Sequence, residues 1–108
     1  MATDRVSPAT IEALAILAAA IKVARLRRGW TVRELAERVG VSHPTIVKVE
    51  RGDPGVAAGT LFEAATLVGV PLLDTDASAR QRYGAHKRVE LALLPAAVRR
   101  RATVDDDF

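Results

Sequence analysis

The stretch at residues 31–52 restricts the fold more than any other part of the chain. It reads TVRELAERVGVSHPTIVKVERG and holds two helix-start signals on either side of a glycine. Thr31 with Glu34 makes a capping box, and Ser42 is a cap whose following proline falls in the first helical turn, where its missing N–H does no harm. Gly40 tolerates the positive φ that a tight turn needs. The stretch therefore predicts two short helices joined by a sharp turn.

The apolar residues of the same stretch fit such a helix pair. Ala36 is the small residue that two crossing helices need at their point of contact. The apolar residues that can anchor both helices on a core are Leu35, Val39, Val41, Ile46 and Val49. Because these spacings agree with each other, residues 31–52 are predicted to form a helix-turn-helix.

Signals of the same kind predict helices in the rest of the chain. Ser7-Pro8 is a cap followed by proline at the first helical position, and the helix it opens can run to Arg28. Thr60 and Glu63 make a second capping box, which predicts the start of a fourth helix. No segment shows the sustained alternation of a half-buried strand. We therefore expect an all-α fold, a five-helix domain of the helix-turn-helix kind with a C-terminal helix and a short tail.

The C-terminal third is expected to supply the last helix and the tail. One of Asp74, Thr75 and Asp76 can cap a fifth helix that runs to about Leu94, where Pro95 stops it. The predicted parts of the chain are a helix-turn-helix domain at 8–73, an appended basic helix at 74–94 and a tail at 95–108.

The first helix carries two apolar stripes. The stripe that suits the domain core consists of Leu14, Leu17, Ile21 and Ala24. A second stripe consists of Ile16, Ala20 and Val23, and it is either buried within the domain or covered by a partner subunit. Trp30, just after this helix, is expected to close the corner between the first two helices.

The composition excludes several kinds of chemistry. The chain has no cysteine and two histidines, which rules out disulfides, thiol catalysis and metal centres built from cysteine or several histidines. We expect no cofactor, no metal and no enzymatic activity, because the few acids and bases form no catalytic constellation. The apolar run Ala13 to Ile21 is too short to span a bilayer, so we expect a cytoplasmic protein without a membrane partner.

Charge is unevenly distributed along the chain. Lys and Arg number 16 against 13 Asp and Glu, which gives a net charge of +3. Basic residues gather at 22–28 and 77–101, whereas Asp105, Asp106 and Asp107 precede the terminal Phe108. Basic blocks beside an acidic tip fit a protein that contacts a polyanion with one surface and another partner with a second.

The helix-turn-helix resembles that of the XRE family of lambda-repressor-like DNA-binding proteins. The resemblance covers about residues 14–73, including IKVARLRRGW before the motif and ERGDPGVAAGTLFEAATLVGVPL after it. It implies a homodimeric repressor whose second motif helix enters the major groove of an inverted-repeat operator in double-stranded DNA. The residues that it places toward the groove are Ser42, His43, Pro44, Thr45 and Lys48. Those that it places near phosphates are Thr31, Arg33 and Arg51.

Two residues depart from the pattern of that family. Val32 stands where members often carry glutamine, which removes one polar contact near the groove. Pro44 can touch a thymine methyl, but it has no donor for a bidentate base contact. Base readout is then expected from His43, Thr45 and Lys48, together with DNA shape.

Several of these residues also have a plainer interpretation. His43 can be an ordinary N-terminal helix residue, and Lys48 suits a phosphate better than a base. Arg51 can simply interact with the C-terminal carbonyls of its helix. Glu34 and Glu50 are interpreted as structural residues, acting through a cap and ion pairs.

The chain is also similar to HipB-like antitoxins of type II toxin–antitoxin modules. The similarity rests on the RGDPGVAAGT loop, the charged helix after the core and the acidic tip that ends in an aromatic residue. It implies a kinase-fold, HipA-like toxin as partner, docked by Asp105, Asp106, Asp107 and Phe108. The tip can instead be a solubility tail or fold back onto its own domain or dimer mate. For the whole chain, a stand-alone repressor and an interaction module with little DNA binding stay open as alternatives.

Overall fold

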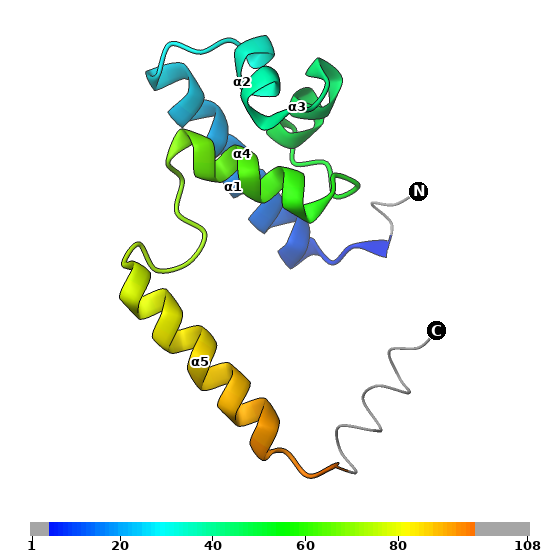
Figure 1. Ribbon diagram of the computed structural model, residues 1–108. Coiled ribbons are helices and arrows are strands. Elements are labelled where there is room, and N and C mark those ends of the chain that lie inside the picture. The colour runs from blue at the N-terminus through cyan, green and yellow to red at the C-terminus, as the bar shows by residue number, and fades with distance from the viewer. Residues whose placement is uncertain (1–4, 97–108) are drawn as a thin grey trace. The chain divides into compact units, whose positions relative to one another are not determined.

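The described part of the chain, residues 5–96 of a computed structural model, folds into five α-helices and contains no strand (Figure 1). The helices are α1 (Pro8–Arg27), α2 (Val32–Val39), α3 (His43–Glu50), α4 (Ala58–Val68) and α5 (Ala77–Leu93). The all-α prediction is therefore confirmed. None of the helices in this range is long and apolar enough to cross a membrane.

The chain divides after Leu72 into two compact units. The first unit contains α1 to α4, and the second contains α5. The helix-turn-helix lies in the first unit, where α2 and α3 pack on each other and both α1 and α4 support them.

Local signals start and stop the first three helices where the sequence predicts. The hydroxyl of Ser7 accepts a hydrogen bond from the Thr10 N–H, and Thr31 and Glu34 make both bonds of the capping box. Ser42 caps α3 through the Thr45 N–H at 3.3 Å. Gly40 has a φ of 84°, so the turn between α2 and α3 uses a left-handed conformation that glycine adopts without strain.

The start of α4 differs from the sequence prediction. The helix begins at Ala58 with Ala57 as its cap residue and no side-chain cap, so Thr60 and Glu63 do not form the expected capping box. Asp53 makes the turn instead: its carboxylate accepts the Gly55 N–H at 2.7 Å. The half-buried Val56 then packs against the core, and α4 begins two residues later, at Ala58. Thr60 lies inside the first turn, in a helical conformation that a cap residue cannot have.

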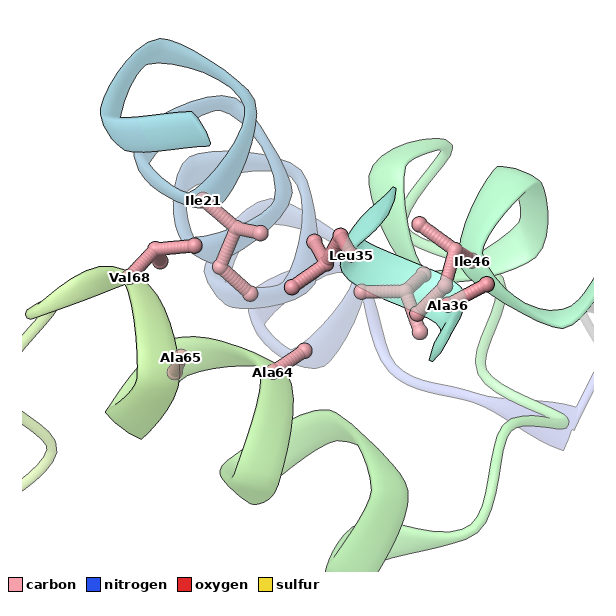
Figure 2. Packing of buried hydrophobic residues seen from close by; sticks show 8 residues of the cluster. Ile21, Leu35, Ala36, Ile46, Ala64, Ala65 and Val68 are labelled. Carbon is pink, nitrogen blue, oxygen red and sulfur yellow. The ribbon is translucent and has the colours of Figure 1, made fainter. Parts of the chain in front are cut away.

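Side chains from all four helices of the first unit form its core (Figure 2). These side chains are small or branched, so the helices can approach closely. Close approach is needed because the chain has few aromatic residues to fill larger gaps. The buried members are Ile21 of α1, Leu35 and Ala36 of α2, Ile46 and Val49 of α3, and Ala64, Ala65 and Val68 of α4. The predicted anchors Val39 and Val41 pack against this cluster and stay half-buried.

A buried ion pair joins α1 to the end of α3. The Arg25 guanidinium donates to both carboxylate oxygens of Glu50, at 2.6 and 2.9 Å. A third donor of Arg25 reaches the carbonyl of Trp30 at 2.8 Å, in the loop that leads into α2. The structural role predicted for Glu50 is thus confirmed, whereas the burial of Arg25 was not predicted.

Trp30 packs against the edge of the core, at the predicted corner, but stays half-buried. The guanidinium groups of Arg28 and Arg38 lie 5.2 and 4.0 Å from the centre of its ring. Both are within the range of a cation–π contact. The indole therefore closes the corner with its apolar body and also holds two cations beside it.

The second unit is built around α5. Asp76 caps it by accepting the N–H groups of Ser78 and Ala79, which selects one of the three predicted cap residues. The helix ends at Leu93, just before Pro95, as predicted. None of its residues is buried, and Glu90 pairs with His86 and Lys87 along its exposed surface.

Candidate nucleic-acid interface

The turn between α2 and α3 is held by the end of α2. The N–H groups of Gly40 and Val41 both donate to the Ala36 carbonyl, at 2.8 and 3.0 Å. Val41 packs against the core, which anchors the turn from below. The direction in which α3 leaves α2 is therefore set by backbone hydrogen bonds and by one apolar side chain.

The two sides of α3 have opposite character. Ile46 and Val49 are buried and lock the helix onto the core. At about 100° per residue, the other side carries a separate set of side chains. This set, which we call the outer face of α3, consists of His43, Pro44, Val47, Lys48 and Arg51. All of them are exposed except Val47, which is half-buried.

The structure therefore brings three of the residues predicted to face the groove and one predicted to lie near phosphates, Arg51, onto one surface. His43 and Pro44 lie in the first turn, and Lys48 and Arg51 follow one and two turns later. A rigid helix with its inner side buried and its outer side free has the form that fits the major groove of B-DNA. His43 supplies a polar ring and Lys48 a charged amine.

Thr45 differs from the other predicted contacts because it is half-buried at the edge of α3. Its hydroxyl lies 2.8 Å from that of Ser42, and its N–H donates to the same Ser42 oxygen at 3.3 Å. Both side chains thus take part in capping α3. This arrangement leaves less of Thr45 available for a base than the sequence prediction assumes.

The helix starts offer fewer free backbone donors than two open N-termini would. At α3, Pro44 has no N–H, and the Thr45 N–H donates to the Ser42 hydroxyl. In the first turn of α3 this leaves the backbone N–H of His43 as the donor that can reach a phosphate. At α2, the N–H groups of Thr31 and Glu34 are both used in the capping box. The side chain of Arg33, in the first turn of α2, is exposed and can approach a phosphate in addition.

Val47 is the functional candidate that the sequence interpretation missed. It lies one turn after both His43 and Pro44 and one turn before Arg51, so it stands in the middle of the outer face. Its helical spacing is the signal that could have identified it. With Pro44 it makes an apolar patch that can contact thymine methyl groups.

The remaining predictions concern the acidic tip, metal binding and the cap role of Glu34. The residues of the acidic tip, Asp105, Asp106, Asp107 and Phe108, lie outside the described residues. Between residues 5 and 96, no three acidic or histidine side chains gather in a way that could hold a metal ion. The predicted cap role of Glu34 is confirmed by its bond to the Thr31 N–H at 3.2 Å.

Comparison with known proteins points to the same part of the chain. The profile of a family described as Helix-turn-helix matches residues 21–74, from the second half of α1 to the segment after α4. The chain is also similar to the HTH-type transcriptional regulator SutR of Escherichia coli (strain K12), with 36% identity over 55 residues. This similarity covers 51% of the chain but 31% of SutR, so the chain spans less than a third of that relative's length. No solved structure matches the chain significantly.

Proposed function

Because this chain belongs to the helix-turn-helix family, we propose that it is a sequence-specific DNA-binding protein that represses transcription as a homodimer. The observation that carries the proposal is the outer face of α3. The face is exposed, carries His43, Lys48 and Arg51, and is backed by buried Ile46 and Val49.

The contacts follow from the chemistry of each side chain. Lys48, Arg51 and Arg33 neutralise phosphates and set the register of the protein on the duplex. His43, in the first turn of α3, reaches a base edge, while Pro44 and Val47 meet apolar groups in the groove. Because α3 has eight residues, one copy makes few contacts, and two copies on an inverted repeat supply the rest.

We predict that His43→Ala and Lys48→Ala weaken DNA binding in different ways. His43→Ala should cost about 1–3 kcal/mol on the operator and little on random DNA, because a base contact carries the loss. Lys48→Ala should weaken both alike and lower the salt dependence of binding by about one phosphate contact. Fluorescence anisotropy over a salt series measures both effects.

Lys22→Ala is the comparison variant: it removes an exposed lysine of α1 that is not on the outer face of α3, and it measures how much the basic block at 22–28 contributes to binding. Equal losses for His43→Ala on operator and random DNA would contradict a base contact. Footprinting should show two half-sites about 34 Å apart on one side of the duplex. A single unrepeated half-site would contradict binding as a two-fold dimer.

We further propose that the protein is the antitoxin of a toxin–antitoxin operon and neutralises a HipA-like kinase toxin. The similarity to HipB-like antitoxins described above supports this assignment. So does α5, which offers large apolar side chains to a partner. These are Tyr83, Val89, Leu91 and Leu93, together with Leu94 at the helix end. Exposed apolar groups in such number on one helix are typical of a surface that another protein covers.

Deleting residues 105–108 tests the antitoxin role and the docking role of the tip. The truncated protein should keep its melting temperature and operator affinity, because three carboxylates in a row repel DNA and the described core consists of residues from α1 to α4. It should neutralise the co-expressed toxin less well and hold it more weakly in a pull-down, since the aromatic anchor is gone. Toxin affinity equal to that of the full chain would leave the tip as a solubility tail.

A further inference from the structure

α1 has one face that the core of its own unit does not use. Its inner face holds Ile21, which is fully buried, and Arg25, which pairs with Glu50. On the opposite side, Ile16 is 63% exposed and Val23 is 46% exposed. We call this side the outer face of α1. Ile16 and Val23 lie two turns apart, and an exposed apolar stripe of this kind on one side of a helix marks a surface that another molecule can cover.

The outer face of α1 has a pattern that is symmetric about its middle. Ala19 and Ala20 lie at the centre, and Ile16 and Val23 each lie three residues farther out. Glu12 and Arg27 each lie seven residues beyond the central pair, and both are exposed. At about 100° per residue, all six positions fall on one side of the helix.

Such a pattern is complementary to its own reversed copy. If two α1 helices pack antiparallel, Ile16 of one copy lies opposite Val23 of the other, and Glu12 lies opposite Arg27. Small alanines at the centre let the backbones approach, apolar side chains flank them, and opposite charges meet at both ends. A parallel pair would instead place Glu12 beside Glu12 and Arg27 beside Arg27, which is unfavourable.

We infer that a second copy of this chain packs on the outer face of α1, antiparallel, with the two-fold axis between Ala19 and Ala20. The inference rests on the proposed homodimer and specifies its interface. It does not depend on DNA binding. Four apolar contacts and two ion pairs between Glu12 and Arg27 then cover the exposed side of the helix, and each pair occurs twice because of the symmetry.

Cysteine cross-linking tests the interface and its register, since the chain has no native cysteine. Ile16→Cys and Val23→Cys chains are mixed under mild oxidation and the products are weighed by mass spectrometry. The mixed dimer should form in large excess, because the two cysteines face each other. Each variant alone should cross-link slowly, since its two cysteines lie about 10 Å apart along the helix axis, beyond the reach of a disulfide. Thr66→Cys, on the exposed side of α4, gives the background rate.

Charge reversal tests the ends of the same interface in the full chain. Glu12→Arg and Arg27→Glu should each raise the dimer dissociation constant about tenfold or more, because each creates two like-charge contacts. The double variant should return it close to the original value. Sedimentation equilibrium measures the constants, and circular dichroism confirms that each variant is folded, as expected for exposed positions.

Several results would overturn the inference. Ile16→Cys cross-linking to itself as fast as to Val23→Cys would mean a different register. A dimer without the mixed cross-link would have its interface elsewhere, and a monomer would leave the outer face to another partner. The proposed function fails separately: a dimer with the 16–23 cross-link that binds no operator would refute DNA binding and keep this interface.

Discussion

Glu50→Ala is expected to lower the free energy of unfolding of the first unit by about 3–5 kcal/mol, because it leaves a buried guanidinium without its counter-charge. The Arg25 and Glu50 side chains are 6% and 7% exposed, and two hydrogen bonds join them. Since small domains have stabilities of about 5–15 kcal/mol, this loss is a large part of the total. Urea denaturation followed by circular dichroism measures it.

Two variants separate the ion pair from the general cost of removing a glutamate. Glu37→Ala truncates an exposed glutamate on α2 and should change stability by about 0.5 kcal/mol or less. The double variant Arg25→Met with Glu50→Leu removes both charges and should be more stable than Glu50→Ala alone, because no charge is left buried. If Glu50→Ala costs no more than Glu37→Ala, the pair has no role in holding α1 and α3 together.

Ala36→Leu is expected to destabilise the helix pair by about 1–3 kcal/mol or more and to abolish operator binding. Ala36 is 3% exposed and lies in the core cluster with Ile46 of α3 (Figure 2). A larger side chain there must push α3 away from α2, which moves the outer face of α3. Thermal melting and operator affinity are the two measurements.

Glu37→Leu is the matched control, because it adds the same leucine to the exposed side of α2.

Gly40→Val disturbs the same helix pair through the backbone. A Cβ at Gly40 would meet nothing within 4 Å, so its cost comes from the φ of 84° and not from crowding. That cost is about 1–2 kcal/mol for an ordinary residue and higher for a β-branched one, whereas Gly40→Asn should be tolerated better. Wild-type melting and operator affinity in Ala36→Leu and Gly40→Val would contradict this account.

Helix boundaries were predictable wherever the signal and the structure it causes are close in sequence. The caps by Ser7, Thr31 and Ser42 join residues three positions apart, so neighbouring residues alone determine them. The predicted start of α4 was wrong because residues outside the local signal determine it. A capping box at Thr60 is a valid local option, but the turn at Asp53 and the packing of Val56 on the core start the helix earlier.

The candidate interface shows the same division. The resemblance to the XRE family placed His43, Pro44 and Lys48 toward the groove, and all three are exposed on α3. The half-buried state of Thr45 depends on how α3 sits on the core, and the central position of Val47 becomes evident once Ile46 and Val49 are known to be buried. Sequence periodicity therefore groups residues into faces, while packing decides which face stays open.

The sequence by itself determined the all-α class, the helix-turn-helix at residues 31–52 and most of the helix ends. These features follow from hydrogen bonds within about one helical turn and from the spacing of apolar residues along the chain. Only the tertiary structure decided that Arg25 is buried, that Glu50 is its partner, and that the outer face of α1 stays exposed. Arg25 and Glu50 are 25 residues apart and meet because α1 and α3 pack together, so no local pattern could distinguish Arg25 from the exposed arginines beside it.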